Sequence, residues 1–420
     1  MASVQPTNRH FSVGPDGNPV YDLHFASEAL GMPASMGYGW ANLDFGQRIG
    51  PDGRYIIERK LGWGGNSSTW LARDDVNRNF VAVKVCTGHT TELDRKNLVW
   101  ESDALRAVSF EPLSPHTIRL LSDFTLPGNE LTGDHLCFVT PLYRGDVSSL
   151  MAARSGKGLP LPLAKRILLH LLRGIVHAHS RSVVHADLKT DNIFIDTRLS
   201  SANVEGFLKE YPARRHEPEL SHEGQIVQSA VSQHFPVISL EEAQEATYVL
   251  GDFGCAQPSR LHDARTINII PNRPPEVWLQ GEWDMPADIW AFGCLLFEIV
   301  TGETLSTWTR AKTWDLPEPN SMLYQMACKT GDNFNGHLLR QWPAAVEYFI
   351  PPSCRFKSFV PNEEVVIYNI SFEACIRGAV EDMGDAEINS LAALMRRCLR
   401  LDPQARASAL DLLDDLWFAE

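Results

Sequence analysis

Alternating apolar and polar positions in the first third of the chain predict several β-strands. Two alternating runs flank the stretch 60–71, with glycines between them, and this arrangement favours a hairpin. Residues 80–85 form an apolar run with a single lysine, which predicts a buried strand. Residues 135–140 have the same character and predict another strand. We therefore expect a β-rich region in this part of the chain.

A three- and four-residue period then predicts a helix from about residue 92 to residue 108. Leu98, Glu101, Leu105 and Val108 fall on one stripe of this helix, so the glutamate lies on an otherwise apolar face. The lysine in the buried run, Lys84, needs a partner because burying an unpaired ammonium group is costly. We expect Glu101 to be that partner. The alternative is that Glu101 lies at the edge of the stripe and extends to water.

A strongly apolar helix is predicted near residues 284–300. Asp284 is a suitable N-cap, Pro286 is placed in the first turn, and Gly302 follows the last apolar residues. These are start and stop signals of an ordinary helix, so the apolar run predicts a buried helix of the protein core.

The glycines between the first two strands carry the first candidate for binding chemistry. Gly62 and Gly64 have no Cβ, so the backbone at these positions can come close to the phosphates of a nucleotide. An ordinary hairpin turn is the alternative interpretation of the same residues.

Two polar stretches later in the chain, 185–192 and 252–254, carry the candidate catalytic chemistry. In this pattern Asp187 accepts the proton of a substrate hydroxyl, Lys189 neutralises the migrating phosphoryl group, and Asn192 with Asp252 holds Mg²⁺. Each of these residues alone fits a solvated turn residue. The interpretation therefore depends on their order along the chain.

Two further elements have the spacing of a structural scaffold around such a site. The residues Pro274, Pro275 and Glu276 occupy the place of an Ala-Pro-Glu element, with Arg406 as the expected ion-pair partner of the glutamate. In the protein-kinase fold, which this order of motifs resembles, Asp288 would hydrogen-bond the backbone of the loop that holds Asp187.

Taken together, these motifs resemble those of eukaryotic protein kinases, and within that group of the SR-protein kinases. The subfamily resemblance rests on the stretch 59–64 with Ser67 in the third glycine position, on the stretch 159–162, on the stretch 286–290, and on an insert between Asn192 and Asp252. It covers about residue 54 to the last residue and implies an α+β, bilobal protein-kinase-like fold with a small β-rich N-lobe and a larger, mainly helical C-lobe.

The resemblance also divides the chain. It implies an N-terminal extension at 1–53, an N-lobe at 54–143 and a C-lobe at 144–420. The C-lobe would contain a spacer-like insert at 196–246 and a second insert at about 305–361. We expect the stretch 1–50 and both inserts to lie outside the compact core, with 1–50 as an extended arm that packs on the N-lobe or stays partly disordered.

The cofactors that the resemblance implies are ATP and Mg²⁺. Thr140 would be the gatekeeper, Pro141 and Tyr143 would face adenine, Ala82 would cover the base and Leu61 would lie at the rim. An ordinary strand threonine is the alternative for Thr140, and the hinge alignment allows a shift of one residue. The implied nucleotide-binding set is Leu61, Gly62, Trp63, Gly64, Gly65, Ser67, Thr69, Ala82, Lys84, Glu101, Thr140, Pro141 and Tyr143.

Composition agrees with one intracellular catalytic unit. The chain has 420 residues, of which 44% are hydrophobic, yet it contains no apolar run of membrane-spanning length and no secretory signal pattern at its start. The 8 cysteines lack Cys-x-x-Cys spacing and are expected to be reduced core thiols. We expect a monomer in the cytoplasm, the nucleus or both, without membrane or direct nucleic-acid binding.

The expected activity is ATP-dependent phosphorylation of serine and threonine in protein substrates. Lys189 favours these hydroxyls over tyrosine, and Ala186 leaves no arginine to clamp a phosphate on Ser259 or Thr266, so activity should not need prior phosphorylation. The net charge of −14 favours basic, Arg/Ser-rich substrates. However, the second insert offers few acidic residues for docking them, among them Asp315, Glu318 and Asp332. The alternatives are a pseudokinase scaffold, a kinase retargeted away from SR proteins and, less favoured, a small-molecule kinase.

Overall fold

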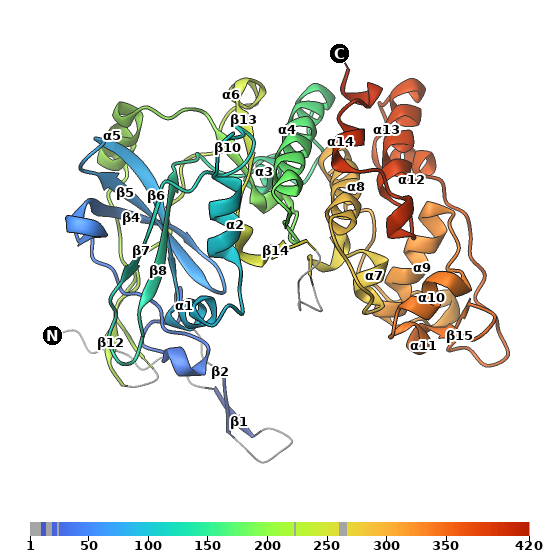
Figure 1. Cartoon of the computed structure of the whole chain (residues 1–420), viewed down its shortest axis with the longest axis horizontal. Coiled ribbons are helices and arrows are strands. Elements are labelled where there is room, and N and C mark those ends of the chain that lie inside the picture. The colour runs from blue at the N-terminus through green and yellow to red at the C-terminus, as the bar shows by residue number, and fades with distance from the viewer. Residues whose placement is uncertain (1–9, 14–18, 23–24, 222–223, 260–266, 420) are drawn as a thin grey trace. The chain divides into compact units, whose positions relative to one another are not determined.

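The structure is a computed structural model that describes residues 10–13, 19–22, 25–221, 224–259 and 267–419. Its contacts divide the chain into two compact units, which we describe separately (Figure 1). Unit 1 comprises Met1–Val99, Arg119–Arg144 and Arg198–Pro236, and unit 2 comprises Trp100–Ile118, Gly145–Thr197 and Val237–Glu420. The expected strand-rich and helix-rich parts correspond to these two units, but each unit is assembled from three separate segments.

Unit 1 is built on a six-stranded antiparallel sheet with the order β3-β4-β5-β6-β8-β7. The strands are β3 (Arg48–Ile49), β4 (Tyr55–Trp63), β5 (Ser67–Asp74), β6 (Asn79–Cys86), β7 (Ser122–Leu126) and β8 (His135–Pro141). Alternate residues of β6, among them Val81, Val83 and Val85, pack into the core on one face. Ala82 and Lys84 therefore point to the other face, as the apolar run with one lysine predicted.

The helix predicted over residues 92–108 is two helices. They are α1 (Gly88–Arg95) in unit 1 and α2 (Glu101–Val108) in unit 2. Asn97 has a φ of 55°, a left-handed conformation that ends an α-helix. The prediction of one helix was wrong because the apolar period continues across this break. Leu98 is 66% exposed, whereas Glu101, Leu105 and Val108 are buried on α2.

The N-terminal region folds in part onto unit 1. Strands β1 (His10–Val13) and β2 (Pro19–Asp22) pair with each other. Leu30, Met32 and Trp40 are buried in one small apolar cluster with Val227. Of the two expected alternatives, an arm that packs on the β-rich part of the chain holds for residues 25–49, because these side chains bury apolar surface.

The insert at 196–246 also differs from the prediction. Residues 198–236 belong to unit 1 and contain helix α5 (Ser201–Glu210) and the paired strands β11 (Glu219–Leu220) and β12 (Ile226–Val227). Val204 and Phe235 are buried against Leu71 of the sheet. The insert is thus a packed part of this unit, because its few apolar residues cover Leu71 on the face of the sheet opposite the main core.

Unit 2 is mainly helical. Its helices are α2, α3 (Val147–Ala152), α4 (Leu161–Ser180), α6 (Leu240–Glu245), α7 (Pro275–Trp278), α8 (Pro286–Thr301), α9 (Glu318–Thr330), α10 (Gly336–Gln341), α11 (Ala345–Tyr348), α12 (Phe372–Ala379), α13 (Asp385–Cys398) and α14 (Ala409–Leu412). Its short strands are β9 (Val183–Val184), β10 (Ile193–Asp196), β13 (Thr247–Leu250), β14 (Gln257–Pro258), β15 (Phe349–Ile350) and β16 (Arg355–Phe356). They form the pairs β9–β14, β10–β13 and β15–β16.

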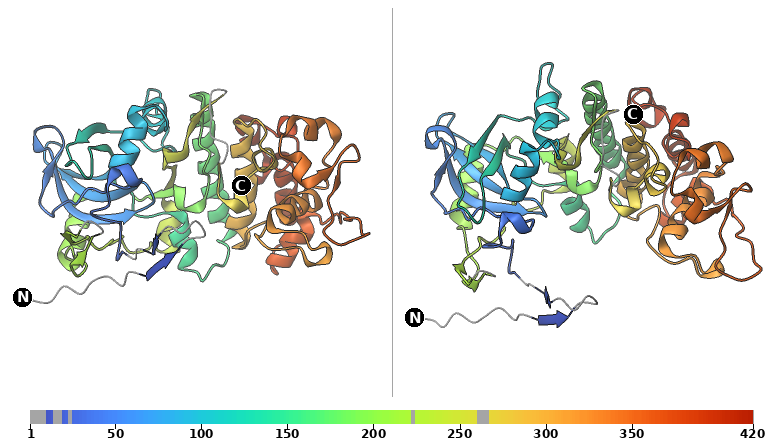
Figure 2. Two further views of the ribbon diagram at one scale, coloured as in Figure 1. Left: turned by 90° about the horizontal axis from the view of Figure 1, so that it is seen from below. Right: turned by 60° about the horizontal axis from the view of Figure 1, so that its bottom comes forward.

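Helix α8 is the buried helix that the apolar run predicted. It lies between α4 and α13, as Figure 2 also shows, and it ends at Gly302, which has a φ of 83°. Pro286 begins the helix as expected, but Asp284 is not its N-cap. The N-cap position is Met285, and the carboxylate of Asp284 accepts a hydrogen bond from the Met285 backbone. No helix in the described part of the chain has the length and apolarity needed to cross a membrane.

The insert at about 305–361 is likewise ordered within unit 2, where it holds α9, α10, α11 and the pair β15–β16. All eight cysteines are free thiols, and five of them are buried: Cys86, Cys137, Cys294, Cys328 and Cys398. Burial raises the pKa of Cys137 and Cys294 to about 12, so these two thiols stay protonated and act as core residues.

Candidate active site

The loop between β9 and β10 brings the three predicted catalytic residues of unit 2 together. The Lys189 ammonium lies 2.6 Å from the Asp187 carboxylate. The side-chain amide of Asn192 donates to the Asp187 backbone carbonyl at 2.9 Å and to its carboxylate at 3.2 Å. Asp187 remains 13% exposed, so its carboxylate is reachable by a substrate hydroxyl. The sequence-based grouping of Asp187, Lys189 and Asn192 is thus reproduced in the geometry.

Asp288, in the first turn of α8, holds this loop from below. Its carboxylate accepts hydrogen bonds from the backbone N–H groups of His185 at 2.8 Å and Ala186 at 2.9 Å, as predicted. It also contacts Nε2 of His179 at 2.9 Å. Burial alone would raise the pKa of Asp288, but these donors and nearby histidines lower it. A charged, fully buried carboxylate therefore fixes the backbone next to Asp187.

Hydrogen bonds at both its N–H and its carbonyl explain how Ala186 is tolerated in an unfavourable conformation. Its φ of 64° is left-handed, which costs energy for a residue with a Cβ. Both its N–H, bound by Asp288, and its carbonyl, which accepts from Asn268 N–H at 2.9 Å, are satisfied. The surrounding hydrogen bonds therefore maintain this backbone conformation.

Asp252 is brought to Asn192 by strand pairing. Ile193 of β10 pairs with Leu250 of β13, and the Gly251 N–H donates to the Asn192 carbonyl at 2.9 Å. Burial alone would lower the pKa of Lys189. The pKa is nevertheless raised, because Asp187 and the nearby charge of Asp252 stabilise the ammonium form. Asp252 therefore lies in the same electrostatic environment as the catalytic loop.

This donor set fits Mg²⁺. Asn192 offers an amide oxygen and Asp252 a carboxylate, and oxygen ligands from one or two carboxylates are what Mg²⁺ prefers at phosphate sites. No group of three or more histidine, cysteine or acidic residues placed for metal binding occurs among the described residues.

Unit 1 carries the predicted phosphate-binding hairpin. Strands β4 and β5 pair Gly62 with Thr69, and the Gly64 N–H donates to the Ser67 carbonyl at 2.9 Å across the turn. A Cβ at Gly64 or Gly65 would meet no atom within 4 Å. The packing of the chain therefore does not require glycine there, which leaves close approach of a ligand as a physical reason for these residues.

Register places the other predicted nucleotide residues of unit 1 on one face of the sheet. Thr69 pairs with Lys84, and Ala82 pairs with Thr140. Cross-strand partners point to the same face, so these four side chains are neighbours on the face opposite the main core. Thr140 and Ala82 are each 8% exposed.

The remaining predicted nucleotide residues occupy less uniform environments. Leu61 packs against the cluster around Leu71 on the same face of the sheet. Pro141 ends β8, Tyr143 follows it partly exposed, and Trp63 is half-exposed. The register gives no independent assignment of Pro141 and Tyr143 to adenine, so their roles remain predictions.

The predicted pair of Lys84 and Glu101 joins residues of different units. Glu101 is the first residue of α2 and is buried, as expected for a helix glutamate on the apolar face. Lys84 belongs to β6 of unit 1. Their pairing therefore stays a prediction.

The scaffold pair is confirmed. Arg406 binds both oxygens of Glu276 at 2.6 and 2.7 Å, and both side chains are fully buried. Such bidentate geometry is what makes a buried ion pair tolerable, because each charge is fully hydrogen-bonded. Arg406 also donates to the Pro286 carbonyl, so the pair connects α7 with the start of α8.

Two residues directly before α7, which stabilise this stretch and its contact with the catalytic loop, were not identified from the sequence. Asn272 is 1% exposed and donates from its side chain to the Leu188 carbonyl at 3.0 Å. Arg273 donates to the carbonyls of Ile267 at 3.1 Å and Asn268 at 3.0 Å. Their position directly before the Pro-Pro-Glu element was the available signal, but nothing in the local pattern identifies the carbonyls that they bind.

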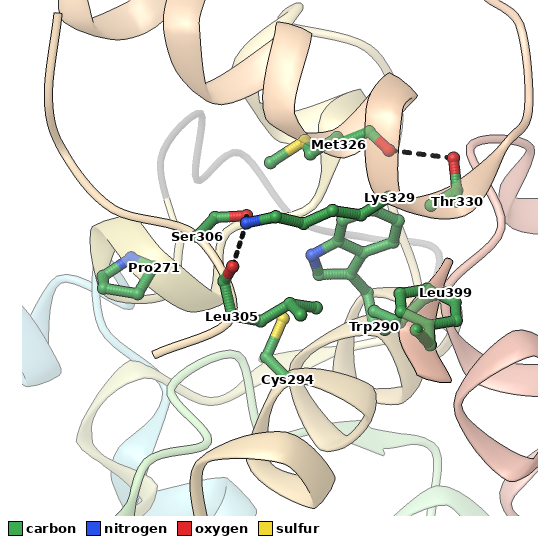
Figure 3. Close-up of a pocket in the computed structure, with 10 residues that line it drawn as sticks. Pro271, Trp290, Cys294, Leu305, Ser306, Met326, Lys329, Thr330 and Leu399 are labelled. Carbon is green, nitrogen blue, oxygen red and sulfur yellow. Dashed lines mark hydrogen bonds between the residues drawn. The ribbon is translucent and has the colours of Figure 1, made fainter. Parts of the chain in front are cut away.

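A small cavity below Pro271 is not a second site (Figure 3). Its volume of about 10 Å³ has room for one water at most. Lys329 crosses it and donates to the Leu305 carbonyl and, at 3.4 Å, to the Ser306 hydroxyl. Burial lowers the pKa of Lys329, and its hydrogen bonds give it a structural role between α9 and the segment at 305–306.

Comparison with known proteins agrees with this geometry. The model of the protein kinase domain matches residues 55–209 and 237–418. A crystal structure of a kinase domain has a TM-score of 0.64 at 18% identity and covers 90% of this chain and 99% of that one, which shows the fold. Residues 210–236, part of the insert that packs in unit 1, lie outside the matched ranges.

Curated relatives name a subfamily. The chain is 24% identical over 391 residues to the serine/threonine-protein kinase SRPK of Physarum polycephalum, across 87% of this chain and 86% of that protein. It is 24% identical to the protein kinase dsk1 of Schizosaccharomyces pombe, across 60% of this chain and 61% of that protein. It is 33% identical over 151 residues to the human SRSF protein kinase 3, across 34% of this chain and 26% of that protein. The chain therefore belongs to the protein kinase family, and the relatives to which it is similar include SR-protein kinases.

Proposed function

We propose that this chain uses ATP and Mg²⁺ to phosphorylate serine and threonine hydroxyls in basic protein segments, most of all Arg/Ser-rich ones. The observation that carries the proposal is the hydrogen-bonded group of Asp187, Lys189 and Asn192 on a loop fixed by Asp288. A pseudokinase is less well supported, because no member of this group is missing. We further propose that the protein is a monomer that works in the cytoplasm, the nucleus or both.

In the proposed reaction Asp187 orients the substrate hydroxyl and accepts its proton. Lys189 is held 2.6 Å from that carboxylate, where its charge can stabilise the phosphoryl group during transfer. Asn192 and Asp252 would hold Mg²⁺, which when bound offsets the charge of the ATP phosphates. Asp288 keeps the loop backbone in place, so little reorganisation is needed when substrate arrives.

We propose that activity does not depend on phosphorylation of the segment after Asp252. Three contacts already connect the end of this segment to the catalytic loop or brace it: Asn268 N–H to Ala186, Asn272 to Leu188, and Arg273 to two carbonyls. None of them needs a phosphate. At Ser259 the hydroxyl lies 3.1 Å from the Asp284 carboxylate, so a phosphate there would meet a negative charge. Thr266 lies outside the described residues.

Enzyme from a bacterial host without eukaryotic kinases should therefore be active as purified. Treatment with a phosphatase should change its kcat by less than about twofold, because Ala186 occupies the position of the arginine that would clamp such a phosphate. Mass spectrometry before and after treatment is the control for phosphate content. A drop of about tenfold or more would show that another cation clamps a phosphate and would contradict this proposal.

The substrate proposal rests on the net charge of −14 and on the SRPK-like relatives. An acidic protein attracts a cationic peptide and raises its encounter rate. The second insert contributes little, because Asp315 is paired with Arg310 at 2.8 Å and Asp332 with Arg400 at 2.8 Å. Glu318 lies at the start of α9 and Glu347 in α11. A kinase retargeted away from SR proteins is therefore the second candidate.

Steady-state assays with two peptides separate these candidates. An Arg/Ser-repeat peptide should have a lower KM than an acidic-context peptide, and its KM should rise as salt screens the attraction. A matched neutral peptide, in which citrulline replaces arginine, controls for length and hydrogen bonding. A lower KM for the acidic peptide would contradict the Arg/Ser proposal. So would a KM for the basic peptide that does not change with salt. Either result would leave the kinase proposal intact.

A further inference from the structure

Two adjacent cations on β4, Arg59 and Lys60, are completely buried just before the glycine-rich turn. Buried charges are costly unless they are paired and hydrogen-bonded. Arg59 lies over the Phe207 ring at 4.4 Å and donates to the Tyr211 carbonyl, both in the insert. Lys60 has partners from a different part of the chain. These partners are what connects the N-terminal segment to the turn.

Lys60 is bound mainly by the segment that precedes the protein kinase domain. Its ammonium forms an ion pair with Glu28, which is 2% exposed, and donates to the Ser27 hydroxyl at 2.5 Å. It also lies 3.4 Å from the Ala230 carbonyl. Residues 27, 28 and 230 all fall outside the ranges that the family model matches, 55–209 and 237–418.

A second contact reaches the turn itself. The ring of Trp63, within the glycine-rich stretch, meets the ring of Trp40 edge-on at 5.9 Å and 84°. The Lys60 ammonium lies 5.7 Å from the Trp63 ring centroid. Trp40 is 3% exposed and is fixed in the cluster with Leu30 and Met32. A rigid N-terminal residue thus contacts the one large side chain of the turn.

The turn has few restraints of its own. Gly64 and Gly65 lie in open space, and the backbone bonds that close the turn are Gly64 N–H to Ser67 and Thr87 N–H to Asn66. Glycine-rich backbone loses much conformational freedom when it is ordered around a ligand. A contact that restricts the turn beforehand reduces that loss and strengthens binding.

We propose that the brace formed by Ser27, Glu28 and Trp40 is a positioning element of the nucleotide site. It acts through Lys60 and Trp63 to restrict the glycine-rich turn, and so it lowers the KM for ATP without taking part in phosphoryl transfer. This inference rests on the proposed ATP-dependent function. The N-terminal segment then contributes to ATP binding by the kinase.

The test uses the full chain with Trp40→Ala. The KM for ATP should rise about three- to tenfold, in line with the loss of an aromatic pair, while kcat and the peptide KM stay within about twofold. Hydrogen exchange of residues 59–69 without nucleotide should become faster. Trp40→Phe, which keeps an aromatic edge, should restore most of both properties.

Ile49→Ala is the matched control, because Ile49 is a buried core residue of β3 that pairs at the far end of β4 from the turn. It should lower the thermal midpoint but leave the KM for ATP unchanged. If Trp40→Ala does not fold, the double variant Glu28→Leu with Lys60→Met replaces the buried ion pair by apolar residues, which leaves no unpaired buried charge. It also removes the contact of the Lys60 ammonium with the Trp63 ring, so it should give the same two effects.

Unchanged hydrogen exchange at 59–69 in a folded brace variant would overturn the inference. An equal rise of the KM for ATP in Ile49→Ala would also overturn it, since general destabilisation would then explain the effect. Absence of phosphoryl transfer in the wild-type protein would instead contradict the proposed function. The hydrogen-exchange experiment needs no nucleotide, so it tests the brace independently of the proposed kinase activity.

Discussion

Replacing Asp187 by asparagine should lower kcat by about 10²- to 10⁴-fold, the usual contribution of a positioned general base. The substitution keeps the size of the side chain but removes the oxygen that accepts the hydroxyl proton. It also removes the charge that Lys189 contacts at 2.6 Å. Binding of Mg-ATP, measured by thermal shift, should persist because the residues predicted to hold the nucleotide are untouched.

The loop should survive this change. Asp288 holds the backbone N–H groups of His185 and Ala186, and Asn192 keeps its bond to the backbone carbonyl of residue 187 at 2.9 Å. The thermal midpoint of Asp187→Asn should therefore be close to that of the wild type. A loss of activity would then reflect a defect in phosphoryl transfer and not unfolding of the protein.

Asp191→Asn is the matched control, since it makes the same chemical change on an exposed residue of the same loop. Its kcat should fall by less than about tenfold. Substantial turnover in Asp187→Asn would show that another group accepts the proton. Inactivity of the wild type towards every protein substrate, with Mg-ATP binding retained, would favour the pseudokinase alternative.

The catalytic loop could be predicted from sequence because its chemistry is compressed into a few positions. Asp187, Lys189 and Asn192 lie within six residues, so a short backbone segment determines their mutual geometry. Asp288 and the pair of Glu276 with Arg406 are distant in sequence, but each lies within a short recognisable motif. Their contacts followed once those motifs were recognised.

The packed extensions could not be predicted for the opposite reason. The insert has only a few apolar residues, such as Val204 and Phe235, separated by polar and proline-containing stretches. Local periodicity therefore favoured a spacer outside the core, although these residues together cover Leu71. The same limit applies to Lys60, a charged residue on a strand whose partner Glu28 lies 32 residues earlier.

The break between α1 and α2 shows a third limit. Hydrophobic period reports which side of a helix would be buried, but it does not report whether the backbone stays helical. Asn97 tolerates the left-handed conformation better than most residues, and it ends the first helix at a point where the apolar spacing continues. An asparagine inside a helical pattern was the signal that the prediction did not use.

Removal of the metal-binding carboxylate should have an effect of a different kind. Asp252→Ala should lose Mg-dependent ATP binding as well as phosphoryl transfer, because Asn192 alone leaves Mg²⁺ without a charged ligand. At about 100 times its Kd, a ligand stabilises the folded state by about 2.7 kcal/mol, so loss of binding is visible as a missing thermal shift.

The backbone at Asp252 calls for a second variant. Its φ of 54° is left-handed, and alanine tolerates this conformation poorly, so Asp252→Ala combines loss of the ligand with strain. Asparagine adopts this conformation readily and keeps one oxygen. Asp252→Asn should therefore fold like the wild type. It should nevertheless lose most of the thermal shift that Mg-ATP causes in the wild type. ATP with EDTA is the control that defines the metal-free baseline for each protein. If the thermal shift with Mg-ATP is the same in Asp252→Asn, Asp252→Ala and the wild type, Asp252 is not a ligand of the metal.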